Sequence, residues 1–425
     1  MPNSAVLPIP AEQRFRAQPV ALHERVASLD LVRGIGVFGI LIVNIQSFAL
    51  VNNARSIPYA RGDGLPINYS IWYLTHVLAD GKFMAVFSFL FGAGICMMSE
   101  RLEAKGLNSS PFYFRRMGFL ILIGIMHSYL LWSGDILFSY GVCGSVCWHF
   151  RHYRPLTLFL LGTIILAIGE YLTLCIWSPS AHGFLVSLYQ VLRDSLHIPV
   201  TSAVQETLIY RGTWTQQMTL RISSSLNTEI ATFWVVTFWR TCGAFLVGMG
   251  LYKTGYLAGS LPRGRYWWFL LIGMVSLLIL AFAAHTCLRF GPSFRHGFLI
   301  DYEWNAWLSI PVALGWAAIG ILLVKRDGFL FLKTGLQAVG RAAFTNYIMQ
   351  TIICTTIFYG HGFGLYGRLD RIRLMWVVTS ICITQLICSK IWLRYIAYGP
   401  IEWLLRYFTY LARPQGFLSS ATTIP

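Results

Sequence analysis

The sequence predicts an all-α membrane protein: a polytopic bundle of about ten transmembrane helices with both termini in the cytoplasm. Hydrophobic residues make up 56% of the 425 residues and charged residues only 12%, whereas a soluble domain carries about 25% charged residues. The apolar residues form continuous runs and do not alternate with polar ones as in a membrane β-barrel. We therefore expect the chain to cross the bilayer repeatedly as helices.

The net charge of +16 fits this class better than it fits nucleic-acid binding. Lys and Arg are spread over many short loops, and they are more frequent in the loops that face the cytoplasm if the N-terminus lies inside. Cytoplasmic loops of membrane proteins carry such an excess, and it also attracts anionic headgroups. We expect membrane lipids as partners and no nucleic acid.

The elements follow from the apolar runs in order. Residues 1–27 form a polar cytoplasmic segment, 28–178 a first five-helix half, 179–228 an extracytoplasmic connection and 229–425 a second five-helix half. The connection has apolar residues at helical spacing, which predicts one or two amphipathic helices on the outer surface. A spanning helix needs about 20 apolar residues, and the runs that qualify are 30–51, 71–99, 114–133, 135–150, 156–178, 229–252, 267–288, 304–324, 341–360 and 373–397.

The first span opens with polar residues that have two interpretations. Asp30 and Arg33 share one helical face and follow Ser28, a typical capping residue. They form either a cap with an interfacial ion pair, or a site where Arg33 binds an anionic group such as a phosphate at the cytoplasmic mouth. Asn44, deeper in the same helix, requires hydrogen-bond partners, and we expect it to face a polar cavity.

The second span contains His76 and Asp80, which lie one helical turn apart. A carboxylate beside an imidazole is the arrangement of an orienting group and a base in many active sites, but it is also an ordinary helix pair. Gly92 and Gly94, further along, predict close helix packing.

The third and fourth spans hold the strongest functional candidates, His127 and Asp135, within FLILIGIMHSYLLWSGDILFSY (119–140). Ionisable groups are costly in hydrocarbon and usually mark a pathway or a reaction site. With the N-terminus inside, His127 lies about one and a half turns below the outer surface, and histidine is the usual general base near neutral pH. Asp135 either orients the imidazole or only caps the fourth helix.

The ninth span and the C-terminal region contribute polar residues near the cytoplasm. Arg341, Thr345 and Tyr347 are expected to line the cytoplasmic mouth. Glu402 and Arg406, four positions apart, indicate an interfacial helix with a structural role.

Most of the nine cysteines lie in apolar segments, where Cys behaves as a small hydrophobic residue. Their spacing does not match a zinc site, and the chain contains no phosphate-binding loop or dinucleotide-binding glycine run. We expect no metal and no required disulfide.

Several motifs together resemble the YeiB-like family of bacterial inner-membrane proteins, whose C-terminal half is a domain of unknown function. The resemblance covers nearly the whole chain and implies a multi-pass protein of the inner (cytoplasmic) membrane. The motifs that carry it are LDLVRGIGVFGILIVNI (29–45), GKFMAVFSFLFGAG (81–94), RRMGFLILIGIMHSYLLWSGDILFSYG (115–141), GMGLYKTGYLAG (248–259), GRAAFTNYIMQTIICTTIFYG (340–360) and GPIEWLLRYFTY (399–410).

This family is similar to a superfamily of transmembrane acyltransferases, which includes the lysosomal heparan-sulfate acetyltransferase and bacterial enzymes that acylate envelope glycans. The resemblance implies that cytoplasmic acyl-CoA, by default acetyl-CoA, donates its acyl group to an extracytoplasmic acceptor such as an envelope glycan or a small molecule. It implies His127 as the base and Asp135 as its orienting acid. His76, with Asp80 beside it, is the nearest counterpart by position to the histidine of the acetyltransferase.

The same resemblance implies where the donor binds. Its phosphates would lie near arginines at the cytoplasmic mouth, and Asn44 or Tyr129 would hold the carbonyl oxygen. The residues implied for donor binding are Arg33, Arg116, Arg341, Asn44 and Asn346.

Two other functions are alternatives. A proton-coupled transporter or permease of a small solute would use the same buried His, Asp and Arg, although the paired broken helices of many carriers are not evident in the sequence. A non-catalytic scaffold of an envelope complex is the third alternative. A homodimer is compatible with all three.

Overall fold

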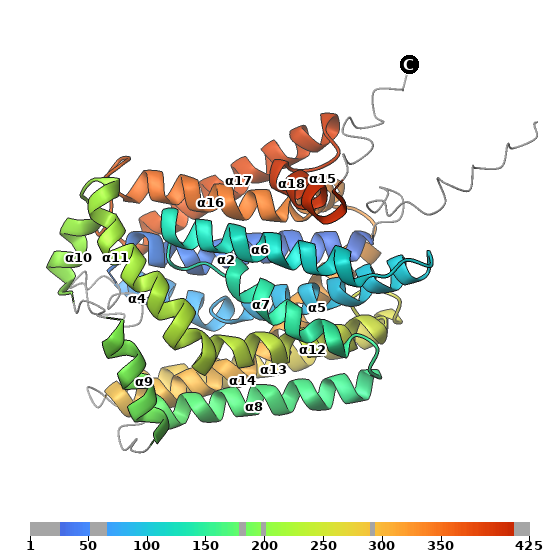
Figure 1. Ribbon diagram of the computed structural model, residues 1–425, viewed down its shortest axis with the longest axis horizontal. Helices are drawn as coiled ribbons and strands as arrows, with labels where there is room; N and C mark the ends of the chain where they lie inside the picture. Colours follow the sequence, from blue (N-terminus) through green and yellow to red (C-terminus); the bar gives the residue numbers. More distant parts are fainter. Residues whose placement is uncertain (1–25, 52–65, 178–183, 197–200, 290–293, 412–425) are drawn as a thin grey trace, which may run out of the picture.

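The computed structural model describes residues 26–51, 66–177, 184–196, 201–289 and 294–411. Within these ranges the elements are helices, and most lie side by side along one direction (Figure 1). This arrangement confirms the prediction of an all-α, multi-pass membrane helix bundle. The predicted N-terminal segment, 1–27, lies almost entirely outside the described residues.

Seven helical segments among the described residues are long and apolar enough to cross a bilayer. Two of them are compound, because α4 runs into α5 through a short break and α11 continues into α12 through a π-helical stretch, η3 (Asn227–Thr237). The helices that form the seven segments are α2 (Ala27–Ala49), α4 (Pro66–Leu78) with α5 (Lys82–Glu103), α8 (Pro155–Trp177), α11 (Trp214–Leu226) with α12 (Phe238–Lys253), α13 (Arg263–Arg289), α14 (Phe294–Lys325) and α17 (Arg371–Tyr395).

Three of the ten predicted spans are helical but are not among these seven. The helix α7 (Leu137–Cys147) has 11 residues and α16 (Ala343–Phe358) has 16. The helix α6 (Ser110–Leu130) has 21 residues, but Arg115, Arg116 and His127 interrupt its apolar run. All ten predicted positions are therefore helical, whereas the number of full-length apolar spans in the described chain is smaller than the sequence predicted.

The bundle has two ends with different coverings (Figure 1). Short helices α15 (Leu330–Arg341) and α18 (Pro400–Tyr410) lie at one end, called here the inner end because the predicted orientation places it in the cytoplasm. The predicted connection lies at the opposite, outer end. It contains three helices, α9 (Phe184–Ser195), α10 (Ala203–Tyr210) and α11, where the sequence predicted one or two.

The two halves of the chain pack closely against each other. The helix α12 contacts both α5 and α8, and α2 contacts α14 and α15. Small residues permit this approach: a Cβ on Gly34 would lie 2.0 Å from the carbonyl oxygen of Leu336, and a Cβ on Gly340 would lie 1.8 Å from that of Asp30. The α2–α15 crossing therefore places backbone directly against backbone.

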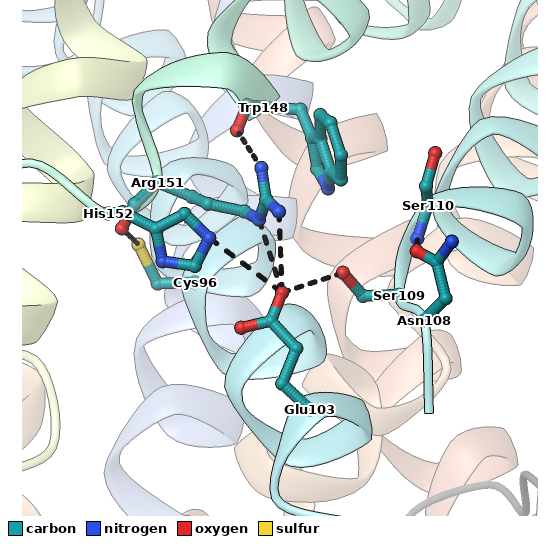
Figure 2. A network of polar contacts seen from close by, with 8 residues as sticks. All are labelled: Cys96, Glu103, Asn108, Ser109, Ser110, Trp148, Arg151 and His152. Carbon is teal, nitrogen blue, oxygen red and sulfur yellow. Dashed lines mark hydrogen bonds and ion pairs between the residues drawn. The ribbon is translucent and has the colours of Figure 1, made fainter. Parts of the chain in front are cut away.

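At the inner end, a polar network around Glu103 joins the end of α5 to the loop before α6 and to the segment after α7 (Figure 2). The Glu103 carboxylate accepts hydrogen bonds from Ser109 Oγ at 2.8 Å and from Arg151 Nε at 3.3 Å. The Arg151 guanidinium lies 3.5 Å from the centre of the Trp148 ring. These contacts fix the loops that follow α5 and α7, so the inner ends of α5 and α6 are held in register.

At the outer end, α10 and α11 pack as a cap over α2, α6 and the loop after α16. Arg221 and Trp214 both donate hydrogen bonds to the carbonyl oxygen of Leu130, at 2.9 and 3.0 Å. Tyr366 donates to Glu206 at 2.7 Å, which ties α10 to that loop. Aromatic rings from both sides fill the space beneath the cap, including Phe48, Trp132, Tyr210, Phe358 and Tyr359.

Candidate functional site

His127 and Asp135 are in direct contact, as the sequence predicted for an orienting acid and a base. His127 Nδ1 lies 2.9 Å from Asp135 Oδ1, and both side chains are buried. The contact forms because α6 ends at Leu130 and the chain turns sharply back, so that residue 135 returns beside the last turn of α6. Gly124 permits this return, since a Cβ there would lie 2.2 Å from the backbone nitrogen of Phe138.

Asp135 makes a contact that corresponds to each of the two roles considered for it. Its second oxygen, Oδ2, accepts the backbone N–H of Phe138 at 2.8 Å, which is a cap on the first turn of α7. Its first oxygen faces the imidazole. Because a carboxylate accepts hydrogen bonds, the proton of the neutral ring is assigned to Nδ1, and Nε2 then carries the lone pair.

The lone pair of Nε2 faces a hydroxyl. Thr351, on α16, places Oγ1 2.9 Å from His127 Nε2, so its hydroxyl donates to the ring. Asp135, His127 and Thr351 thus form a buried acid–imidazole–hydroxyl chain built from three elements. In catalytic triads the same three groups stand in this order: the imidazole takes a proton from the hydroxyl, and the acid holds the imidazole in position.

The cap closes the outer side of this chain. His127 is 2% exposed, and the carbonyl oxygen of Leu130, one turn beyond it, is the one bound by Arg221 and Trp214. The ring of Trp132 lies edge-on to the His127 ring, at 6.4 Å between centres. In this structure α11 and Trp132 therefore lie between His127 and the outer end of the bundle.

A cavity of about 340 Å³ opens between α2, α5, α6, α7, α15, α16 and α18. Its lining extends along α2 from Val26 to Ile40, which corresponds to a depth of about 21 Å at 1.5 Å per residue. Apolar side chains dominate the walls, among them Val37, Phe87 and Leu90. The volume falls within the range of small-molecule sites, about 300–1,000 Å³.

The mouth of the cavity is strongly basic. Six cationic side chains line it against two acidic ones, Asp30 and Glu402. Asp30 accepts a hydrogen bond from Arg33 at 3.0 Å, so the predicted ion pair is present and lies at the mouth. The cationic residues are Arg33, Arg101, Lys105, Arg116, Arg341 and Arg406.

Glu402 is tied to the beginning of α16. Its Oε1 accepts the backbone N–H groups of Phe344 and Thr345, at 2.7 and 3.1 Å. Burial raises the pKa of Glu402, and the hydrogen bonds from Thr345 and Phe344 oppose that rise. Glu402 therefore caps α16 at the edge of the cavity, and the six cations still outnumber the two acidic residues of the lining.

The deep end of the cavity approaches His127 without reaching it. Ile136, Leu137, Tyr140 and Tyr347 line this end, whereas His127 is not a lining residue. The rings of Tyr347 and His127 are 5.3 Å apart between centres. Tyr347 therefore stands between the cavity and the acid–imidazole–hydroxyl chain.

The other predicted site residues lie elsewhere. His76 and Asp80 contact each other at 3.3 Å where α4 meets α5, and neither lines the cavity. Asn44 is half-buried on α2 above the cavity. Asn346 donates to Ser389 Oγ at 2.9 Å and joins α16 to α17. Tyr129 also lies outside the cavity lining.

Sequence reasoning missed several residues of this region. Arg101 lies in the last turn of α5 and Lys105 just after that helix, and both line the mouth together with Arg406. Their basic character near a predicted helix end was a signal, but only the helix arrangement shows that they converge with Arg33. Thr351 carried no signal, because Thr is ordinary in an apolar helix and its partner His127 is 224 positions away.

Comparison with known proteins decides the family. A family described as "Protein of unknown function (DUF418)" matches residues 251–412. The chain is 30% identical to "Uncharacterized protein YeiB" of Escherichia coli (strain K12) over 410 residues, which cover 91% of this chain and 96% of that protein. The chain belongs to the YeiB-like family.

Other YeiB-like relatives match along the same length. "Uncharacterized protein YxaH" of Bacillus subtilis (strain 168) is 28% identical, with 93% of this chain and 96% of the relative covered. A 39.9 kDa protein from the amylase 3' region of Bacillus acidopullulyticus is 26% identical over 92% of this chain and 96% of its own. In this YeiB-like protein, Tyr347 and Thr351 lie within the residues matched by DUF418, whereas His127 and Asp135 precede them in the sequence.

Proposed function

We propose that this YeiB-like protein is an acyltransferase of the bacterial inner membrane. It takes an acyl group, by default acetyl, from cytoplasmic acyl-CoA and transfers it to an extracytoplasmic acceptor of the cell envelope. The observation that carries the proposal is the combination of one cavity, basic at its inner mouth and apolar inside, with a buried acid–imidazole–hydroxyl chain behind its deep end.

The cavity supports the donor half of the proposal. Acyl-CoA has a phosphate-rich nucleotide at one end and a slender, mostly uncharged arm that ends in a thioester. Six cationic side chains at the mouth suit the phosphates, and the apolar depth of about 21 Å suits the arm. The volume of about 340 Å³ accommodates the arm while the nucleotide remains at the mouth.

His127 supports the transfer half. Its Nε2 faces the Thr351 hydroxyl at 2.9 Å, which marks the position where an acceptor hydroxyl or amine would present its proton. His127 accepts that proton as the acceptor attacks the thioester carbon, and Asp135 stabilises the imidazolium that forms. The thiolate of CoA leaves and is protonated by the imidazolium, which restores the neutral ring.

The test is acetyl transfer by the purified protein in nanodiscs, measured with labelled acetyl-CoA as binding and as slow hydrolysis or transfer to added envelope extract. We expect His127→Ala to bind acetyl-CoA normally and to lose at least about 100-fold in rate. His76→Ala is the matched control, because His76 is also paired with an acid but lies away from the cavity, and it should retain full activity.

The donor site is tested separately. Arg341→Gln should weaken acetyl-CoA binding and reduce its dependence on salt, since one cation is removed from the mouth. Arg115→Gln removes a charge one residue away from Arg116 that does not line the cavity, and it should bind acetyl-CoA like the parent protein. Failure of the parent protein to bind acetyl-CoA, with uptake of a solute by proteoliposomes, would replace the proposal with the carrier alternative.

A further inference from the structure

We infer that Tyr347 binds the carbonyl oxygen of the donor's thioester at the deep end of the cavity. The inference rests on the proposed acyl-CoA activity and deepens it, because it places the reacting carbon. It replaces Asn44 and Tyr129 in this role, since neither residue lines the cavity.

The Tyr347 hydroxyl is buried without an acceptor for its proton. The side chain is 7% exposed, and its oxygen has no hydrogen-bond partner of good geometry within the described part of the chain. The backbone N–H of Ile136 faces the hydroxyl, but an N–H group only donates. A buried hydroxyl is normally paired, so a donor left open beside a cavity indicates a ligand oxygen.

The other tyrosine at the deep end is already occupied. Tyr140 donates to the carbonyl oxygen of Met84 at 3.2 Å and lies 2.9 Å from Ser88 Oγ. Both tyrosines line the same end of the cavity, yet only Tyr347 keeps a hydroxyl proton without an acceptor in the described structure. We therefore assign Tyr347 to ligand binding and Tyr140 to packing.

The position of Tyr347 also fits the chemistry. Its ring lies 5.3 Å from that of His127, and Thr351 follows one turn later on the same helix. A carbonyl oxygen bound by Tyr347 would therefore place the thioester carbon near the hydroxyl that faces Nε2. In the transfer step the acceptor oxygen bonds to this carbon, its proton moves to Nε2, and the C–S bond breaks to release CoA.

During that step the carbonyl oxygen gains negative charge. A hydroxyl held in position by the fold donates to it at no cost of reorganisation, and in other enzymes loss of one such donor lowers turnover by about 10²–10³-fold. Tyr347 would supply this donor from α16, whose first turn is fixed by Glu402.

Two CoA analogues test the inference by binding alone. The first is a ketone in which CH₂ replaces the thioester sulfur, so that the carbonyl is kept; the second is S-ethyl-CoA, which has no carbonyl. Isothermal titration in nanodiscs should show that Tyr347→Phe weakens the ketone about five- to tenfold, the effect of one hydrogen bond, and leaves S-ethyl-CoA unchanged. Tyr140→Phe is the matched control and should leave the affinity for each of the two analogues unchanged. Thermal unfolding is recorded for both variants.

The outcomes separate the two claims. If both analogues bind the parent protein and Tyr347→Phe weakens them equally or not at all, the carbonyl assignment is wrong while the acyl-CoA site stands. If neither analogue binds the parent protein, the proposed function fails and the assignment falls with it. A selective loss of the ketone, together with a transfer rate lowered about 10²-fold or more, supports both.

Discussion

Substitution of Asp135 by Asn separates the two duties of this carboxylate. Asp135 accepts Phe138 N–H through Oδ2 at 2.8 Å and faces His127 Nδ1 through Oδ1 at 2.9 Å. An amide has one oxygen and one NH₂ group, so Asn keeps one acceptor and loses the other. If the oxygen stays on Phe138, the NH₂ group faces Nδ1 and forces the ring proton onto Nε2.

The magnitudes follow from this geometry. A hydrogen bond to a charged group contributes about 1.5–3 kcal/mol and a neutral one about 0.5–1.5 kcal/mol, so replacing the first by the second should cost about 1 kcal/mol of stability. The effect on turnover should be larger, because the atom that must accept a proton now carries one. The equivalent change in a serine protease triad lowers turnover about 10⁴-fold, and we expect at least about 10²-fold here.

The assay measures acetyl transfer and thermal unfolding of Asp135→Asn, His127→Ala and the double variant in nanodiscs. Because the two residues act as one unit, the double variant should be little slower than either single variant. Full turnover by Asp135→Asn, with only the stability loss, would show that Asp135 is a cap and nothing more. Additive rate losses would show that the two side chains act independently.

Two further predictions concern the packing and the outer loop. Gly340→Ala places a Cβ 1.8 Å from a backbone carbonyl of α2 and should lower stability by about 1–3 kcal/mol. Gly118→Ala, inside α6, meets no atom within 4 Å and should unfold at or above the parent temperature, because Ala favours a helix over Gly. Burial, and to a smaller extent the positive charge of Arg221, lower the pKa of His361 below 6.5. Below pH 6.5 the imidazole therefore takes up a proton more readily in the unfolded loop than in the folded loop, and the folded loop loses stability as pH falls. The protection of backbone amides near His361, which contacts Gln217 at 3.2 Å, should fall between pH 7.5 and 5.5 once measured exchange rates are corrected for the intrinsic pH dependence of exchange. His361→Asn should abolish that fall.

The sequence predicts the local features of this protein well, because they depend on residues close together in the chain. Apolar runs of about 20 residues locate helices, and His127 and Asp135 are eight positions apart, so a single turn brings them together. The prediction of helices within the connection 179–228 is likewise confirmed, at α10 and α11. The number of full-length spans is less predictable, since α7 and α16 are apolar yet too short.

Features that depend on helix order lie beyond sequence reasoning. The basic mouth joins Arg33, Arg101 and Arg406 from three distant helices, and nothing in one sequence shows that they face a common space. The role of Tyr347 depends on a missing partner, which only the surroundings of its hydroxyl reveal. Asn346 looked equally suitable in the same motif, but the twist of α16 turns it toward α17.

The most direct test of the central claim is a cryo-EM structure of the protein with the ketone analogue of acetyl-CoA. The account predicts density along the cavity, with the nucleotide phosphates among Arg33, Arg116 and Arg341 and the carbonyl oxygen within hydrogen-bonding distance of the Tyr347 hydroxyl. Density for a lipid chain in the cavity, with the analogue bound elsewhere or not at all, would contradict it.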